Sequence, residues 1–120
     1  MAEIKGKMFF STSEFDKKWE AMGLDMDDLR RLENEILNNP QIGSVVQGTG
    51  GLRKIRFASE NTGKSGGVRA LYVDYVVFER VYLITAYPKS QKEDISPAEK
   101  AIIKKLIEQT YKELGGKDNE

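Results

Sequence analysis

The amino-acid sequence predicts one α+β domain, in which an antiparallel sheet of about four strands is covered by an N-terminal hairpin of two helices and by a C-terminal helix. Three segments carry apolar residues at spacings of three and four, which is typical of amphipathic helices. Segments rich in β-branched and aromatic residues follow one another closely in the second half of the chain, as antiparallel strands do. The chain has 120 residues, enough for one core, so we expect a single domain over 1–120 with a flexible tail at 116–120.

The first 40 residues predict a strand followed by the helical hairpin. The segment MFFSTSEF at 8–15 begins with a short apolar run that predicts the strand, and Ser13 is a suitable N-cap for the next helix. Gly23 ends this helix, Asp25 begins the second, and Asn-Asn-Pro at 38–40 ends it. The apolar faces consist of Phe15, Trp19 and Met22 in the first helix and of Met26, Leu29, Leu32, Ile36 and Leu37 in the second. Both faces need a sheet to cover.

Three strands and the last helix are predicted after the loop QGTGG. The strands are LRKIRFA at 52–58, VRALYVDY at 68–75 and RVYLITAY at 80–87, and the last two are close enough to form a hairpin. Ser96-Pro97-Ala98-Glu99 is a capping box with proline at the first helical position, and Gly115-Gly116 ends the helix. The face of this helix that is expected to pack on the sheet consists of Ile102, Ile103, Leu106, Ile107, Thr110 and Leu114.

Two residue types are absent from the sequence, and their absence excludes several functions. Without cysteine there is no disulfide and no thiolate chemistry, and without histidine the chain lacks the usual general base and the commonest metal ligand. We therefore expect no metal site and no cofactor. No apolar run is long enough to span a membrane, and the polar N-terminus MAEIKGK is unlike a signal peptide, so we expect a cytoplasmic protein without a membrane partner.

The segment ASENTGKS at 58–65 matches the loose form of a phosphate-binding loop, and LYVD at 71–74 resembles a magnesium-binding strand end. A phosphate-binding loop joins a strand to the N-terminus of a helix, whose dipole and free N–H groups hold the phosphates. Here the motif leads instead into VRALYVDY, which has the alternation of a strand. The sequence therefore argues against a nucleoside-triphosphate site and predicts a loop between two strands, with Lys64 at its tip.

The formal net charge is zero, but it is unevenly distributed. Residues 1–49 carry six basic and nine acidic side chains, residues 50–92 carry eight basic and three acidic, and residues 93–120 carry five basic and seven acidic. A polyanion responds to the local potential more than to the total charge. The middle segment, with a net charge of +5, is therefore the part of the chain most suited to nucleic acid.

Several of these cations are expected to share one surface. Lys54 and Arg56 are two residues apart on one predicted strand and so share a face, whereas Arg53 points to the other. Antiparallel pairing brings Arg69, at the start of the next strand, near the far end of the first. The end of the last strand adds Tyr87, Lys89 and Lys92. The cations that closure of the sheet would gather are Lys54, Arg56, Arg69 and Lys89.

Such a surface has a structural and a functional interpretation. It is a solvated face or a sheet edge protected by charge, or it is a groove in which guanidinium groups bind phosphates bidentately. The rings of Tyr72 and Tyr87 could stack on RNA bases. For both residues, and for Trp19, we favour a position in the hydrophobic core over contact with a base. In an RNA-cleaving site without histidine, a lysine crowded by cations acts as a base, and arginine stabilises a pentacovalent phosphate.

The segments QGTGGLRKIRFA, GKSGGVRALYVDY and VYLITAYPKSQKEDIS, followed by a C-terminal helix, resemble the RelE/HigB superfamily of bacterial toxins and its HigB branch in particular. The resemblance covers roughly residues 37–114. It implies a small RelE-like fold and the toxin of a type II toxin–antitoxin system, which enters the A site of the 30S ribosomal subunit and cuts the bound messenger. The messenger's 2′-hydroxyl attacks the adjacent phosphate without a metal or cofactor. The implied partner is a helix-turn-helix antitoxin of the HigA type.

Carried over residue by residue, the resemblance makes Lys54 and Arg56 the basic pair, with the lysine as base, and makes Arg69 the residue that stabilises the transition-state phosphate. Ser90 and Ser96 stand where RelE has a basic residue and a base-stacking tyrosine, so Lys89, Lys92 or Tyr87 must take over the acid and stacking roles. The expected catalytic residues are Lys54, Arg56, Arg69 and Lys89. The residues expected to bind RNA or the ribosome are Arg53, Lys64, Tyr87 and Lys92.

Two other functions fit the same fold. ParE proteins share it but poison DNA gyrase without the basic catalytic set, so Lys54, Arg56 and Arg69 favour the nuclease. An inactive RNA-binding member of the family would keep the basic surface without cutting, and from the sequence this alternative stays open.

Overall fold

The computed structural model describes residues 6–58, 67–91 and 94–117, and the described chain contains three helices and five strands around a single sheet. In chain order the elements are β1 (Met8–Ser11), α1 (Ser13–Ala21), α2 (Met26–Asn38), β2 (Ser44–Val45), β3 (Arg53–Phe57), β4 (Val68–Tyr75), the 3₁₀ turn η1 (Val76–Phe78), β5 (Arg80–Pro88) and α3 (Pro97–Glu113). The α+β class and the order of the predicted elements are therefore confirmed. ASENTGKS falls largely outside the described residues, but β4 follows it as a strand, as predicted.

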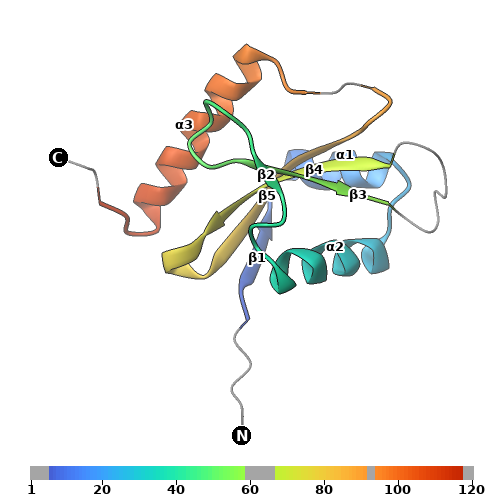
Figure 1. Cartoon of the computed structure of the whole chain (residues 1–120), viewed down its shortest axis with the longest axis horizontal. Coiled ribbons are helices and arrows are strands. Elements are labelled where there is room, and N and C mark those ends of the chain that lie inside the picture. The colour runs from blue at the N-terminus through green and yellow to red at the C-terminus, as the bar shows by residue number, and fades with distance from the viewer. Residues whose placement is uncertain (1–5, 59–66, 92–93, 118–120) are drawn as a thin grey trace, which may run out of the picture.

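The sheet has the strand order β1-β5-β4-β3-β2 (Figure 1). Neighbours from β2 to β5 are antiparallel, and β1 is parallel to β5. This corrects the predicted sheet in two ways. It has a fifth strand, β2, which is too short to show alternation, and its first strand is parallel to its neighbour. The partner of β1 lies about 70 residues further along the chain, so no local pattern could have identified it.

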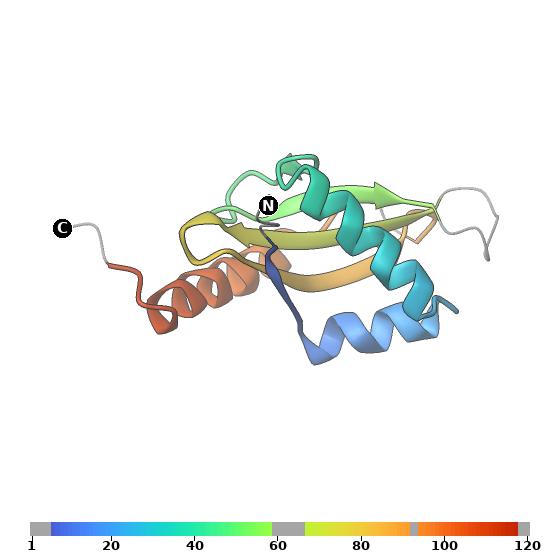
Figure 2. The ribbon, with the colours of Figure 1, turned by 90° about the horizontal axis from the view of Figure 1, so that it is seen from below.

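Each face of the sheet carries its own hydrophobic core. In Figure 2, α2 crosses in front of the strands and α3 lies behind them. The first core includes Phe15, Trp19, Leu32 and Ile36 of α1 and α2 and Ile55, Phe57, Val68, Ala70 and Tyr72 of the sheet. The second includes Ile103 and Ile107 of α3 and Leu71, Val73, Tyr75, Ile84 and Tyr87 of the sheet. Both faces of the central strands are thus covered, which explains why β4 and β5 are rich in apolar residues on both sides.

The helix starts follow their capping residues. Ser96 caps α3 with the predicted capping box. Asp25 begins α2, as predicted, and it also forms a complete capping box, which was not predicted. The cap of α1 is Thr12 rather than the predicted Ser13. The hydroxyl of Thr12 accepts a hydrogen bond from the Phe15 N–H at 3.0 Å and donates one to the Ile84 carbonyl at 2.6 Å. The bond to β5 is a tertiary contact, and it shows why Thr12 is preferred to its neighbour.

Helix α3 buries a narrower stripe than its periodicity predicts. Ile103 and Ile107 are buried, but the exposed fraction is 69% for Ile102 and 39% for Leu106. The expectation that these two residues face the sheet is therefore wrong. Within the described chain, Ile103 and Ile107 are the buried residues of α3, and Leu114, just after it, packs against the same core.

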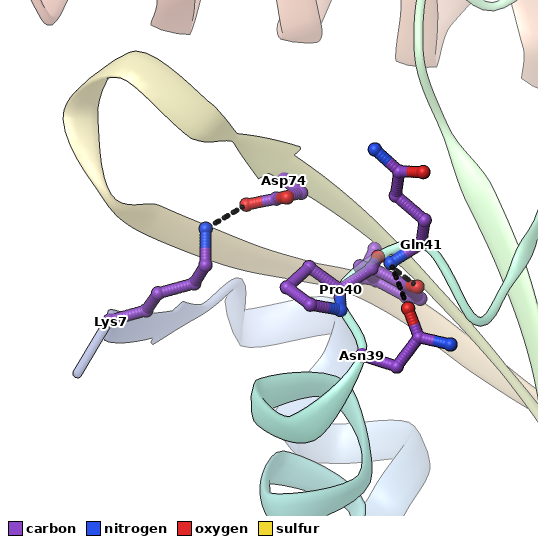
Figure 3. Close-up of polar contacts among 6 residues, drawn as sticks. Lys7, Asn39, Pro40, Gln41 and Asp74 are labelled. Atoms are coloured by element: carbon purple, nitrogen blue, oxygen red, sulfur yellow. Dashed lines mark hydrogen bonds and ion pairs between the residues drawn. The ribbon is translucent and has the colours of Figure 1, made fainter. Parts of the chain in front are cut away.

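A long-range ion pair ties the residue before β1 to the middle of the sheet. Lys7 Nζ donates to Asp74 Oδ1 on β4 at 2.9 Å, as Figure 3 shows, and the two side chains are 16% and 6% exposed. Figure 3 also shows the end of α2, where the Asn39 side-chain oxygen accepts from the Gln41 N–H at 3.3 Å.

Among the parts of the chain that the structure describes, no helix has the length and apolar composition needed to cross a membrane.

Candidate nucleic-acid interface

Three cations stand on the sheet face that α3 partly covers. Ile55 and Phe57 belong to the first core, so the alternation of β3 turns Lys54 and Arg56 to the opposite face. Lys54 is paired with Leu71 of β4, and Arg56 with Arg69. Leu71 lies in the second core, which places all three cations on the α3 side. We call Lys54, Arg56 and Arg69 the basic face.

Arg56 and Arg69 are directly opposite each other in the antiparallel pair. Directly opposed residues point to the same side of a sheet, and like charges in this position destabilise it. Arg56 is exposed and Arg69 is half-buried. Guanidinium groups match a phosphate in geometry, so the basic face offers cations of a kind suited to a phosphate.

Lys54 has an acidic partner that the sequence did not single out. Its Nζ donates to Asp94 Oδ1 at 2.6 Å, with exposed fractions of 19% for the lysine side chain and 63% for the aspartate. The hydrogen bond and charge of Lys54 hold the pKa of Asp94 below its usual range, and the charges of Lys100 and Arg69 lower it further. Asp94 is part of the segment VYLITAYPKSQKEDIS that carries the family resemblance, but no role was predicted for it. Its contact with Lys54 of β3 joins residues 40 positions apart in the sequence.

Lys89 lies at the same end of the sheet. Its backbone N–H donates to the Gly67 carbonyl at 3.1 Å, which extends the pairing of β4 with β5 beyond the Val68–Pro88 pair. Tyr87, two residues before it, is opposite Arg69. Lys89 is half-buried and directly follows β5, which pairs with β4, the strand of Arg69. The place of its side chain beside the arginines stays a prediction.

Two of the predicted RNA-binding residues do not join the basic face. Arg53 points to the other face, where it donates to the carbonyls of Gly43 at 2.6 Å and Gln41 at 3.3 Å. Tyr87 is only 1% exposed and belongs to the second core, so its ring offers no face to a base in this conformation. Tyr72 and Trp19, at 0% and 5%, are core residues as expected. Lys64 and Lys92 lie outside the described residues.

A cavity in the described chain lies away from the basic face. It has a volume of about 780 Å³ and lies between the loop at Gly50-Gly51, the end of β4 and the C-terminal half of α3, where Tyr75 and Tyr111 line it. None of its lining residues belongs to the basic face. An extended phosphodiester binds along charged surfaces rather than in enclosed cavities, so we place the site by its charges and not by the cavity.

Comparison with known proteins identifies the fold and the family. Residues 7–117 match the family model of the RelE toxin of the RelE / RelB toxin-antitoxin system. A mutant of the E. coli toxin RelE in the free state has a TM-score of 0.53 and 19% identity, over 74% of this chain and 90% of that chain. The isolated E. coli RelE toxin gives 0.53 and 18%, over 84% and 99%. A chain of the intact E. coli RelBE toxin-antitoxin complex gives 0.52 and 19%, over 69% and 96%. At these identities the structures show a shared fold, while the family model spans nearly the whole sequence, and this chain therefore belongs to the RelE toxin family.

Proposed function

We propose that this toxin is a ribosome-dependent messenger RNA endoribonuclease of the HigB-like branch. The observation that carries the proposal is the cross-strand pair Arg56–Arg69, with Lys54 two residues away on the same face. A gyrase-poisoning toxin of the ParE type has no use for such a constellation, whereas a phosphodiester does. An inactive RNA-binding relative would share the basic face, so only a cleavage assay separates it from the enzyme.

The proposed chemistry is the one that the family resemblance implies, and the charges of the basic face suit it. The messenger's 2′-hydroxyl attacks the adjacent phosphate and forms a pentacovalent intermediate with extra negative charge on its equatorial oxygens. Arg56 and Arg69 are placed to bind these oxygens, and such preorganised donors are usually the largest contribution to catalysis. Lys54 adds a point charge, and Lys89 is the cation that protonates the leaving 5′-oxygen. The products are a cyclic phosphate and a 5′-hydroxyl, and no metal or cofactor takes part in the proposed reaction.

The proposed partners follow from the family. The toxin is a member of a toxin-antitoxin family, and E. coli RelE has been solved in a complex named RelBE. We propose a cognate helix-turn-helix antitoxin of the HigA type for this chain. The second partner is the A site of the 30S subunit with its messenger, which places the action in the cytoplasm.

The test is induction of the wild-type protein and of Arg69→Ala in a bacterial host, followed by mapping of messenger 5′ ends. We expect in-frame cuts in translated messages with the wild type. Loss of one transition-state donor should reduce cleavage by Arg69→Ala about 100-fold or more, or about 3 kcal/mol. Arg30→Ala is the matched control, since it removes the same charge from a side chain on α2 that is 71% exposed.

Each outcome separates the candidate functions. Cuts that persist with Arg69→Ala would remove the role assigned to this arginine. Growth arrest without cuts would favour the ParE-like function. A wild type that neither arrests growth nor cuts would be an RNA-binding or inactive member.

A further inference from the structure

Asp94 is a carboxylate held against the basic face by the fold. Lys54 Nζ donates to its Oδ1 at 2.6 Å, while the aspartate side chain remains 63% exposed. The next residue, Ile95, is 5% exposed and belongs to the second core. Ser96 follows as the cap of α3 in a complete capping box. The core and the helix start therefore fix the backbone beside Asp94, while its carboxylate remains largely exposed to solvent.

The proposed cleavage needs a group that accepts the proton of the 2′-hydroxyl. The chain contains no histidine. Lys54, to which the family resemblance gives this role, is engaged in an ion pair with a carboxylate at 2.6 Å, and the ammonium of an ion pair has no lone pair to accept a proton. Arginine keeps its proton throughout the accessible pH range. Among the described residues that contact the basic face, Asp94 brings a carboxylate, whose oxygen can accept a proton.

The groups that face Asp94 come from three elements: Lys54 of β3, Arg69 of β4 and Lys100 of α3. All three are cations, and together with the Lys54 hydrogen bond they lower the pKa of the aspartate. The carboxylate is thus ionised throughout the neutral range. It is an intrinsically weak base, but it stands beside the cations that would hold the phosphate, and position contributes strongly to general-base catalysis.

We propose that Asp94 is the catalytic base of this toxin and that Lys54 positions it while binding the scissile phosphate; this rests on the proposed nuclease function. An Asp94 oxygen takes the proton of the 2′-hydroxyl, and the 2′-oxygen forms a bond to phosphorus. The bond from phosphorus to the 5′-oxygen breaks, its electron pair stays on the 5′-oxygen, and Lys89 protonates that oxygen. Asp94 then releases its proton to water, and Lys89 regains one from water.

The test is single-turnover cleavage of messenger on programmed ribosomes by the wild type, Asp94→Asn, Asp94→Glu and Lys54→Arg. We expect Asp94→Asn to cleave about 100-fold or more slowly than the wild type, with unchanged ribosome affinity and thermal unfolding. Asp94→Glu should recover part of the rate, and Lys54→Arg should stay within about tenfold of the wild type, since arginine also binds a carboxylate. Asp27→Asn is the matched control, because it removes the same charge from a side chain on α2 that is 87% exposed.

The pH profile gives an independent readout. With Asp94 as base, the wild-type rate should be nearly constant from about pH 6 to about pH 8.5, whereas a lysine base would raise it about tenfold per pH unit. Asp94→Asn that cleaves at the wild-type rate or faster would overturn the inference and leave the nuclease function standing. A rate that rises about tenfold per pH unit, together with an inactive Lys54→Arg, would likewise overturn the inference and leave the nuclease function standing. A wild type that fails to cleave would instead overturn the proposed function itself.

Discussion

Single tyrosine hydroxyls join parts of the chain that are distant in sequence. The Tyr72 hydroxyl donates to the Pro40 carbonyl at 2.8 Å and accepts from the Gly43 N–H at 3.0 Å. A Cβ on Gly43 would lie 2.9 Å from the Tyr72 ring, so this close approach requires glycine. The Tyr75 hydroxyl donates to the Ile107 carbonyl of α3 at 2.9 Å. Each ring fills a core, and each hydroxyl holds a neighbouring loop or helix in place.

The two buried tyrosines predict that the folded protein loses stability at alkaline pH. Burial raises the pKa of Tyr75 to about 12, against a smaller lowering by a hydrogen bond with Thr110 and with a still smaller increase from Tyr82. Burial also raises the pKa of Tyr72. An unfolded tyrosine ionises near pH 10, so the folded state is favoured in full below pH 10. We expect the free energy of unfolding to fall as the pH rises from about 10 to about 12, by on the order of 2 kcal/mol for Tyr75.

Urea unfolding at a series of pH values checks this for the wild type and for Tyr75→Phe. The variant keeps the ring but not the ionisable group, so its stability should fall less steeply above pH 10, with the remaining slope due in part to Tyr72. Equal slopes for the two proteins would show that Tyr75 does not ionise on unfolding in this range.

At the scale of elements, α3 is held by a narrow stripe and by its start. Ile103 and Ile107 are four residues apart and buried, and Tyr75 and Tyr111 stack near the far end, with their ring centroids 6.5 Å apart. The capping box at Ser96 fixes the beginning of the helix. Because Asp94 lies two residues before this cap and next to the buried Ile95, the docking of α3 also sets the position of the carboxylate at the basic face.

The two neighbours Leu106 and Ile107 should respond very differently to the same substitution. Ile107 is 4% exposed and Leu106 is 39% exposed. Ile107→Asp buries a charge in the second core and should cost about 3 kcal/mol or more, or unfold the protein. Leu106→Asp should cost less than about 1 kcal/mol. Thermal unfolding of both variants checks this, and an equally large loss for Leu106→Asp would mean that the helix turns a wider face to the sheet.

At the scale of the whole molecule, the start of the described chain is held to the sheet by two contacts that are distant in sequence. β1 reaches its place beside β5 across about 70 residues. The Lys7–Asp74 pair, 67 residues apart, adds a largely buried ion pair between the start of β1 and β4. Such a pair contributes little net stability over an apolar pair, but a single buried partner left alone is costly.

We therefore expect Asp74→Ala to lower the free energy of unfolding by about 3 kcal/mol, because it leaves the Lys7 ammonium without its carboxylate. The double variant Lys7→Met with Asp74→Leu should lie within about 1 kcal/mol of the wild type. Urea titration of the three proteins gives the values. Should Asp74→Ala match the wild type, Lys7 would be reaching solvent rather than depending on the pair.

The sequence by itself determined the elements whose signals are local. The helix start at Asp25, the capping box at Ser96, the alternation of β3 and β4 and the glycine-proline punctuation all act within a few residues, and the structure agrees with each of them. Alternation also sufficed to place Lys54 and Arg56 on one face, and antiparallel pairing brought Arg69 to Arg56. The shared face of these three cations was therefore predictable from spacing and strand pairing.

The remaining features were decided only by tertiary structure. The parallel pairing of β1, the short strand β2, the choice of Thr12 over Ser13 as cap and the exposure of Leu106 all depend on which distant segment packs alongside. The burial of Tyr87 depends on where α3 docks, and the contact of Asp94 with Lys54 spans 40 residues. A sequence pattern records the period of an element, whereas the partners of each side chain are set by the packing of the elements against one another.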